Sequence, residues 1–511
     1  MLNRDTTQRT GINIASQWGL NAVNIVVNFF LIGYVVTRVG TEHYGGWTAI
    51  VSIIGCLSML DAGMSVAIQH YAAGFSASSQ KSELISLFSS AHIIYIIIAV
   101  SVMLLCLVIS FIYPTIFPKV PINAALECVV ALRWISAAML FFIMNMPVSG
   151  VLLGLQCHYI RNTIEIFSLL IRAGVVVASF QTFGPSLAYL GAAFFAAAIV
   201  RFVLNKVAIM KIEPHIRFSF SSVTRTSLRN IFSYGGHTFI WTIATVVIRD
   251  SGPILANIIL DATSATYLFV GARLVQTFGA FITGAGQVFV PLASSLQASK
   301  EKARLQSALL RGTRLCSLLG LSGAMVLIIF GRAILFHWVE FDDITGYLVV
   351  VIMTIGRLST WMFVVPLSML KGMRALWSIT IMLVTCTISC LILMLLLSHY
   401  FGLLGLATAT LLPIFLAYSF WVPAKICHLT EVKVGRLLKE AIPTAVSIAI
   451  LVAATAWGIQ KVCVPAQLPT LVIELAIVLT LFLILAMFFG LDPASRAVLL
   501  SKAGLKHTRS T

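Results

Sequence analysis

Charged residues are scarce in this sequence. Only 10% of the 511 residues are charged, whereas 59% are hydrophobic and the mean hydropathy is +1.00. A soluble protein carries about 25% charged residues, so this composition excludes a water-soluble fold, and it is too apolar for a disordered chain. Acidic residues are the scarcest, because 17 Asp and Glu stand against 34 Lys and Arg, a formal net charge of +17. Such an excess can indicate a nucleic-acid partner, but membrane proteins also concentrate cations in cytoplasmic loops.

Metal-binding and redox motifs are also missing. The nine cysteines form no CxxC pair and no Cys/His cluster with metal-ligand spacing, and most lie in apolar runs, where free cysteine packs as a small hydrophobic residue. We therefore expect no metal site and no cofactor. A cleavable signal peptide is not expected either, because the first apolar run, Gly11 to Thr37, is too long for one.

Long uncharged runs occupy most of the chain. A membrane-spanning helix needs about 20 mostly apolar residues, and the runs predict about fourteen such helices. The run from Ala375 to Ala424 is long enough for two helices, separated at a helix-stop signal that ends at Gly402. Helices satisfy their own backbone hydrogen bonds in lipid, and the alternating pattern of barrel strands is absent. The expected fold class is an all-α, multi-pass (polytopic) membrane protein.

The two halves of the sequence resemble each other. Pro147–Gly154 is similar to Pro366–Gly372, and Phe183-Gly184 is similar to Phe401-Gly402, at nearly the same offset. We therefore expect two pseudo-repeated six-helix lobes followed by two added helices, and such duplication is typical of transporters. The expected domains are an N-lobe over 1–211, a C-lobe over 212–428, two further helices over 429–490 and a cytoplasmic tail over 491–511.

Cations are distributed unevenly between the two sides of this predicted topology. With a cytoplasmic N-terminus, most of the 34 Lys and Arg fall in inner segments, and the outer loops hold only Arg38, Lys119, Arg332 and Lys461. The positive-inside rule therefore predicts that both termini are cytoplasmic. Because the outer loops are short, the chain offers no place for the catalytic domain that a membrane glycosyltransferase or polymerase needs.

Arginine is the only cation inside the predicted spans. A charge at that depth is costly and usually functional, and a guanidinium can hold phosphate oxygens through two parallel hydrogen bonds. We therefore predict a cationic, substrate-binding cavity that uses Arg133, Arg172, Arg201, Arg249, Arg273 and Arg357. The alternative is that each arginine pairs with a nearby acid or extends toward the membrane interface.

Acidic residues inside the spans are candidates for ion coupling or for pairing with these cations. They are Asp61, Glu165 and Asp250. Asp61 can partner an arginine or titrate during transport. Glu165 shares a helix face with Arg172 but lies two turns away, and Asp250 directly follows Arg249, so those two adjacent side chains should point in different directions. Glu474 lies in the last predicted span, and we expect a structural role for it.

Short motifs add a family resemblance. The turn from Val39 to Trp47 resembles the LG-x-x-x-YG-x-W turn between the first two helices of bacterial polysaccharide flippases, and Leu60-Asp61-Ala62-Gly63 resembles their LDxG segment. The same pattern continues in Ser233-Tyr234-Gly235, Asp250, Tyr267 and Pro291-Leu292. The sequence is therefore identified as a member of the O-antigen type flippases of the multidrug/oligosaccharidyl-lipid/polysaccharide exporter superfamily. One departure is Gln69-His70, where relatives often have a basic residue.

The resemblance implies a transporter and not an enzyme. Such a flippase moves undecaprenyl-pyrophosphate-linked oligosaccharides across the bacterial inner membrane by alternating access, for surface polysaccharides such as O-antigen or exopolysaccharide. Coupling to H+ or Na+ is one option for its energy source. The polymerase and glycosyltransferases of the pathway are the expected protein partners, whereas nucleic acid is not expected. The alternatives are an organic-cation multidrug exporter, a peptidoglycan-precursor flippase, and a membrane glycosyltransferase or polymerase.

Overall fold

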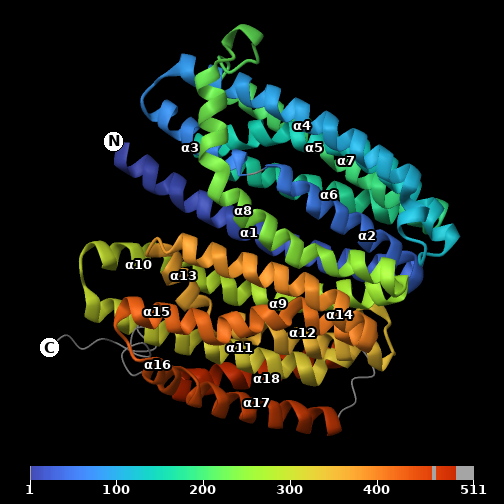
Figure 1. Cartoon of the computed structure of the whole chain (residues 1–511), viewed down its shortest axis with the longest axis vertical. Helices are drawn as coiled ribbons and strands as arrows, with labels where there is room; N and C mark the ends of the chain where they lie inside the picture. The colour runs from blue at the N-terminus through green and yellow to red at the C-terminus, as the bar shows by residue number, and fades with distance from the viewer. Residues whose placement is uncertain (1, 62, 463–467, 491–511) are drawn as a thin grey trace. The chain divides into compact units, whose positions relative to one another are not determined.

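Helices make up nearly all of the computed structural model, which describes residues 2–61, 63–462 and 468–490 (Figure 1). In that part of the chain, 13 segments are long and apolar enough to cross a membrane. One of them, Leu376–Thr430, has 55 residues and is interrupted by the non-helical backbone of Gly402. It therefore supplies two crossings, which confirms the expected all-α membrane fold with about fourteen spans.

Residues Met1–Thr266 form the first of two compact units. Its elements are α1 (Leu2–Val39), α2 (Thr41–Leu57), the 3-10 turn η1 (Ser58–Asp61), α3 (Met64–Ala77), α4 (Lys81–Ile116), α5 (Ile122–Gly154), α6 (His158–Phe183), α7 (Leu187–Ile212), the 3-10 turn η2 (Phe220–Ser222) and α8 (Arg225–Ile259). Helix α5 packs against both α4 and α7, and α6 packs against α1 and α7.

Helix α8 belongs to this first unit. It packs against α2, α3 and α4, and Asn257 near its end donates a hydrogen bond to the Gly45 carbonyl of α2, at 3.0 Å. The two compact units consequently divide after Thr266. The boundary expected from the sequence lies instead after residue 211, where the six-helix repeat is expected to end. That repeat boundary stays a prediction, because compactness and sequence duplication are different properties.

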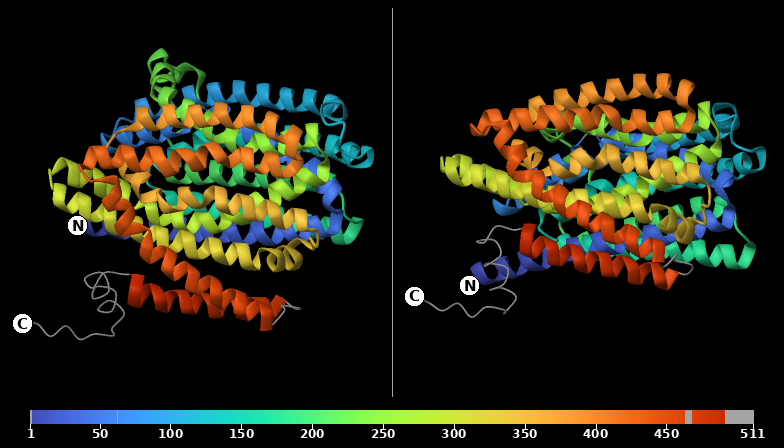
Figure 2. Two further views of the ribbon diagram at one scale, coloured as in Figure 1. Left: turned by 60° about the horizontal axis from the view of Figure 1, so that its bottom comes forward. Right: turned by 90° about the horizontal axis from the view of Figure 1, so that it is seen from below.

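The second unit covers Tyr267–Thr511. Its elements are most of α9 (Ala262–Gln287), α10 (Phe289–Ala298), α11 (Lys302–Val339), α12 (Ile344–Met362), α13 (Val364–Gly372), α14 (Leu376–Leu416), the π-helical turn η3 (Ala417–Trp421), α15 (Val422–Thr430), α16 (Val434–Ala441), α17 (Pro443–Val462), α18 (Leu468–Leu485) and the π-helical turn η4 (Ala486–Gly490). Helix α12 packs on α11 and α14, and α17 lies beside both α11 and α18 (Figure 2). The expected tail, 491–511, lies outside the described residues.

Two of the crossing segments are interrupted at glycines with positive φ. Gly63 has φ 75° and ψ 8° between η1 and α3, and Gly402 has φ 55° and ψ −134° within α14. Glycine adopts these conformations without the steric cost that a Cβ brings. The break at Gly63 frees backbone groups that lipid cannot satisfy, so it belongs where protein surrounds it or where it lines a cavity, whereas the break at Gly402 separates two crossings.

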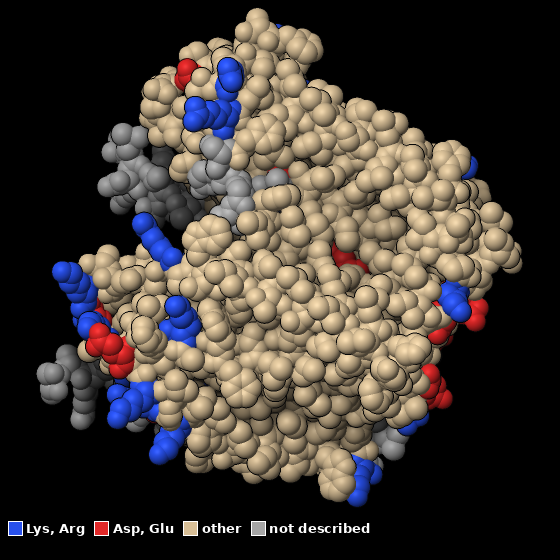
Figure 3. Space-filling model, in the orientation of Figure 1, with Lys and Arg blue, Asp and Glu red and all other residues tan. Residues whose placement is uncertain are grey.

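The surface of the units follows the pattern of a protein solvated by lipid. Figure 3 shows one face, on which charged residues gather at the ends of the helices and the surface over their middle is almost entirely uncharged. Large apolar side chains are exposed on both units, among them Phe111 (71%), Ile388 (55%) and Leu395 (56%). Such exposure would promote aggregation in water, but it is favourable against acyl chains.

Candidate functional site

The first unit contains a small cavity at the interruption of its second membrane segment. The cavity has a volume of about 170 Å³ and lies between α2, η1, α4, α5 and α8. Asp61, Tyr95 and Arg249 are its polar lining residues, whereas side chains such as Met139 and Phe142 supply an apolar wall. The fold therefore brings two of the predicted site residues, Asp61 and Arg249, to one cavity.

Asp61 is held by two hydroxyl groups. Ser65 Oγ, one turn further along the chain, donates to Asp61 Oδ2 at 2.7 Å, and the Tyr95 hydroxyl on α4 donates to Asp61 Oδ1. Only 1% of Tyr95 is exposed, so its hydroxyl has a fixed position. Hydrogen bonds to an ionised acceptor are stronger than neutral ones, and these two stabilise a carboxylate within the membrane. Sequence reasoning found Asp61 but missed Tyr95, whose signal is a polar group in an otherwise apolar run.

Arg249 and Asp250 form an ion pair although they are adjacent on α8. Arg249 Nε lies 3.1 Å from each carboxylate oxygen of Asp250, and Nη2 donates to Oδ2 at 2.7 Å. The expectation that these side chains point in different directions is therefore wrong. The arginine side chain is long enough to fold back along the helix to its neighbour. Asp250 is buried and Arg249 is partly exposed, so the guanidinium is the member of the pair that reaches the cavity.

A second ion pair joins α6 and α7. Arg201 Nη1 donates to Glu165 Oε1 at 2.5 Å, and the Arg201 guanidinium also lies 4.6 Å from the ring centroid of Phe142. Both side chains of the pair are mostly buried, with exposed fractions of 15% and 22%. Glu165 thus pairs with a cation on the next helix and not with Arg172, two turns away on its own helix.

Two further arginines of the first unit have different surroundings. Arg172 donates from Nη2 to Asn28 Oδ1 at 2.6 Å and lies 4.8 Å from the ring centroid of Phe194, so both contacts are with neutral groups. Arg133 is exposed and lies 5.5 Å from the ring centroid of Phe111, itself an exposed residue. The arrangement at Arg133 is the one expected of a cation on the outer surface of a helix bundle, where its stem covers apolar surface.

Two of the predicted arginines, Arg273 and Arg357, lie in the second unit. Arg273 on α9 lies 4.9 Å from the ring centroid of Phe269, one turn earlier. Arg357 lies about 20 Å along α12 from the first residue of that helix, at ~1.5 Å per residue. Neighbouring Gly356 allows α12 to approach α14 closely, since a Cβ there would lie 2.6 Å from Leu411 Cβ.

Arg357 has no carboxylate partner among the described residues. No ion pair involves it in the described part of the chain, and the ionisable groups that interact with its charge are the Tyr418 hydroxyl and the Cys390 thiol. Tyr418 belongs to η3, and π-helical turns occur frequently at functional sites. The Arg357 guanidinium therefore keeps a positive charge that no described carboxylate neutralises. The charges of Arg201 and Arg249, in contrast, are neutralised by Glu165 and Asp250.

Metal coordination has no obvious place in this arrangement. Among the described residues, no three His, Cys, Asp or Glu side chains are grouped as a metal ion would require. The polar groups instead form ion pairs, hydroxyl–carboxylate contacts and arginine–aromatic contacts. Such groups can bind anions, protons or monovalent cations.

Comparisons with known proteins agree with the architecture. The family described as "Polysaccharide biosynthesis protein" matches residues 12–297, more than half of the chain, while no curated protein matches the sequence. The solved structure of the lipid II flippase MurJ, in an inward closed conformation, has a TM-score of 0.69 at 14% identity, covering 93% of this chain and 98% of MurJ.

Multidrug transporters share the fold as well. An inward-facing multidrug resistance MATE family transporter of the MOP superfamily has a TM-score of 0.65 at 14% identity, covering 80% of this chain and 96% of that one. A mutant of the Vibrio cholerae MATE transporter VcmN has a TM-score of 0.53 at 13% identity, covering 83% of this chain and 98% of that one. At such identities the structures show a shared fold and leave the substrate open. The chain belongs to the polysaccharide biosynthesis protein family, and it has the multi-pass membrane fold seen in MurJ and in the MATE transporter.

Proposed function

We propose that this transporter moves oligosaccharides linked to undecaprenyl pyrophosphate from the cytoplasmic to the outer leaflet of the bacterial inner membrane, for surface polysaccharide biosynthesis. Membership of the polysaccharide biosynthesis family supports this substrate class. The observation that carries the proposal is the mid-span guanidinium of Arg357, which no described carboxylate neutralises. The glycosyltransferases that build the repeat unit and the polymerase that consumes it are the proposed partners, and both termini are proposed to be cytoplasmic.

The chemistry of Arg357 suits a pyrophosphate. A guanidinium keeps its charge in any surroundings and can donate two parallel hydrogen bonds to phosphate oxygens. Attraction between the two charges is stronger at low dielectric than in water, so a single cation in the span has a large effect on an anionic head group. Arg172 and Arg273, which are arginines of other membrane-spanning helices, are the next candidates for the same role. Arg201 and Arg249, being ion-paired, contribute less in this scheme, and Arg133 contributes least.

Alternating access needs two bodies that change their relative position around a substrate site. The division of the chain into two compact units supports such a mechanism. The energy source is proposed to be a H+ or Na+ gradient acting at Asp61, because this carboxylate lies in a cavity beside a helix interruption. Replacing Asp61 with Asn would then abolish the dependence of translocation on the ion gradient, whereas an unchanged dependence would exclude Asp61 as the coupling residue.

The substrate proposal is tested by replacing the cation. In a strain lacking the native gene, Arg357→Ala should abolish surface polysaccharide while the protein remains in the membrane, and Arg357→Lys should restore part of it because the charge returns without the bidentate geometry. Arg332→Ala is the control, since Arg332 forms an exposed pair with Asp342 at 3.3 Å. Unchanged polysaccharide in both Arg357→Ala and Arg273→Ala would contradict the proposal.

The rival substrates give different phenotypes. An organic-cation exporter requires acidic groups in its binding site, but Glu165 and Asp250 are engaged by arginines. Deleting the gene should therefore leave susceptibility to cationic drugs unchanged. The deletion strain should also be viable, whereas loss of a peptidoglycan-precursor flippase would be lethal.

A further inference from the structure

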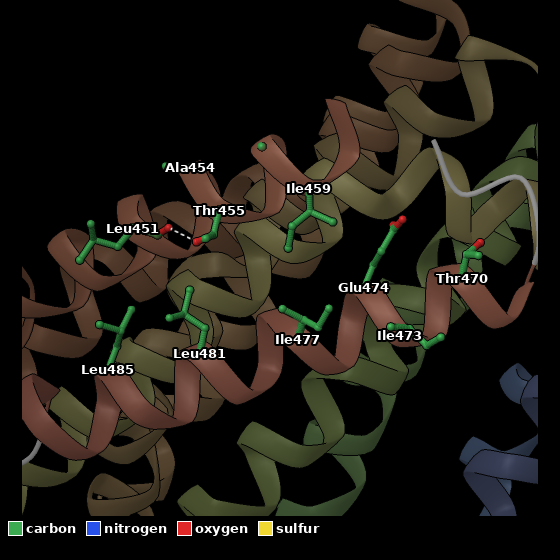
Figure 4. A pocket seen from close by; sticks show the side chains of 11 residues that line it. Leu451, Ala454, Thr455, Ile459, Thr470, Ile473, Glu474, Ile477, Leu481 and Leu485 are labelled. Atoms are coloured by element: carbon green, nitrogen blue, oxygen red, sulfur yellow. Dashed lines mark hydrogen bonds between the residues drawn. The ribbon is translucent and has the colours of Figure 1, made fainter. Parts of the chain in front are cut away.

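A large apolar groove lies between the last two helices of the second unit. It has a volume of about 950 Å³ and is formed by α17 and α18. Its lining residues are Leu451, Ala454, Thr455, Gly458, Ile459, Thr470, Ile473, Glu474, Ile477, Leu481 and Leu485 (Figure 4). Glu474 is the one charged residue among these described lining residues, and the other polar side chains of the lining are the hydroxyl groups of Thr455 and Thr470.

Glu474 lacks a partner for that carboxyl group. Only 4% of the residue is exposed, and neither carboxylate oxygen has a hydrogen-bond partner among the described residues. Figure 4 shows the side chain leaving α18 toward α17, on the side of Ile459. Burying an ionised carboxylate without a partner is costly, so this carboxyl group either stays protonated or binds a ligand that supplies a positive charge or hydrogen-bond donors.

The remainder of the groove has the dimensions of a lipid chain. Ile477, Leu481 and Leu485 follow Glu474 on successive turns of α18 and extend about 16 Å from it, at ~1.5 Å per residue. On the opposite wall, Gly458 leaves open space, since nothing lies within 4 Å of the position that its Cβ would take. An acyl chain can therefore lie along the two helices with its polar end at Glu474.

A cation lies at the end of the helix pair where α17 ends and α18 begins, which is also the end nearer to Glu474. Lys461 belongs to the last turn of α17, and its ammonium lies 4.0 Å from the ring centroid of Trp457. It follows Gly458 by three residues, so it lies on the same side of α17 as that glycine. A carboxyl group in the groove and an ammonium in the last turn of α17 suit a zwitterionic head group, in which a cation and a phosphate are neighbours.

We propose that this groove binds a phospholipid with a primary ammonium head group, of the phosphatidylethanolamine type. Its ammonium binds the carboxylate of Glu474, its phosphate lies toward Lys461, and one acyl chain fills the apolar part of the groove. Glu474 excludes an anionic lipid by charge repulsion, and a quaternary ammonium has no N–H to donate to the carboxylate oxygens. The site is separate from the proposed binding of the pyrophosphate substrate and does not depend on it.

Lipid selectivity tests the proposal. The full-length protein is purified from a mixture of equal amounts of phosphatidylethanolamine, phosphatidylcholine and phosphatidylglycerol, and the retained lipids are identified by native mass spectrometry. The wild type should retain phosphatidylethanolamine with at least about tenfold preference, corresponding to ~1.4 kcal/mol. Glu474→Gln should remove this preference, whereas the control Glu440→Gln should keep it, because Glu440 is an exposed residue that pairs with Arg436.

A second variant separates the groove from the carboxylate. Gly458→Leu fills the open space and should reduce retention of all three lipids, while Glu474→Gln changes selectivity alone. Equal retention of the three lipids by the wild type, as a protonated Glu474 would give, overturns the proposal. An unchanged preference in Glu474→Gln overturns it as well. If that variant does not insert, the selectivity of the wild type and the effect of Gly458→Leu decide the matter.

Discussion

Gly55 on α2 lies directly against the carboxylate of Asp250 on α8. A Cβ at residue 55 would stand 2.1 Å from Asp250 Oδ2 and 2.7 Å from Asp250 Cγ, closer than real carbon atoms approach. The carboxylate cannot easily move away, because the guanidinium of Arg249 binds both of its oxygens. The absence of a side chain at position 55 therefore permits a buried ion-paired carboxylate to pack against the second membrane segment.

Replacing Gly55 with Ala should destabilise the first unit. The added methyl group must displace Asp250 or separate α2 from α8, and overpacking of this kind costs about 1–3 kcal/mol. The measurement is the thermal unfolding of the purified variant in detergent. Gly74→Ala is the matched control, since Gly74 is exposed on α3 with nothing within 4 Å of its Cβ position, and it should be neutral or stabilising. Equal stability of Gly55→Ala and wild type would disprove the close contact.

Removing the Tyr95 hydroxyl should lower the stability of the first unit, because Asp61 loses a hydrogen-bond donor. Tyr95→Phe leaves the carboxylate with Ser65 as its remaining hydroxyl donor, and loss of a hydrogen bond to a charged group costs about 1.5–3 kcal/mol. Tyr113→Phe, on the same helix, is the control. The Tyr113 hydroxyl donates to the neutral Gly46 carbonyl at 2.8 Å. Loss of a neutral hydrogen bond in a membrane protein costs only about 0.6 kcal/mol on average. Unfolding of both variants in denaturant gives the comparison, and equal losses would count against an ionised Asp61.

Breaking the Arg201–Glu165 pair from one side should cost more than removing both partners. Glu165→Leu leaves a mostly buried guanidinium without its counter-charge, and losing one member of a buried pair costs about 3 kcal/mol. The double variant Arg201→Met with Glu165→Leu should lose less, because no charge remains to be solvated. A double-mutant cycle on stability measures the coupling. The exposed pair of Arg332 and Asp342 should show a coupling below about 1 kcal/mol, and a similar value for Arg201–Glu165 would refute the prediction.

Asp343 caps the N-terminus of α12 and makes its stability depend on pH. Its Oδ1 accepts a hydrogen bond from the Thr345 backbone N–H at 3.0 Å, and this bond lowers the pKa of the Asp343 carboxyl. The carboxylate therefore stabilises the fold at pH values above its unfolded-state pKa of about 3.9. This stabilisation disappears as the pH falls through the lower folded-state pKa.

Asp343→Ala should consequently lose about 1 kcal/mol at neutral pH, as is typical of an N-cap, and the loss should shrink in acid. Asp343→Asn keeps a side-chain acceptor for the same backbone N–H, so it should stay close to wild type at neutral pH. Thermal unfolding of the three proteins across the acidic range provides the test. A loss in Asp343→Ala that is independent of pH would argue against the capping carboxylate.

The membrane architecture follows from local properties of the chain. A run of about 20 apolar residues partitions into lipid as a helix regardless of its neighbours, because each helix satisfies its own backbone hydrogen bonds. The number of spans, the all-α class and the interruption at Gly402 were therefore predictable from composition and from single residues. The motif around Asp61 was visible for the same reason, as it lies within a short stretch of sequence.

The partners of the buried polar groups depended on contacts between distant segments. Glu165 pairs with Arg201 and not with Arg172 because α6 and α7 face each other there, and Tyr95 reaches Asp61 from a different helix. Helix α8 joins the first compact unit through its packing on α2, which no local pattern reveals. Glu474 changed from an expected structural residue to a proposed ligand site once its carboxylate was found buried without a partner. Hydrophobicity thus determined which segments become membrane helices. The packing of those helices against one another determined which charged side chains form ion pairs and which remain available for a substrate.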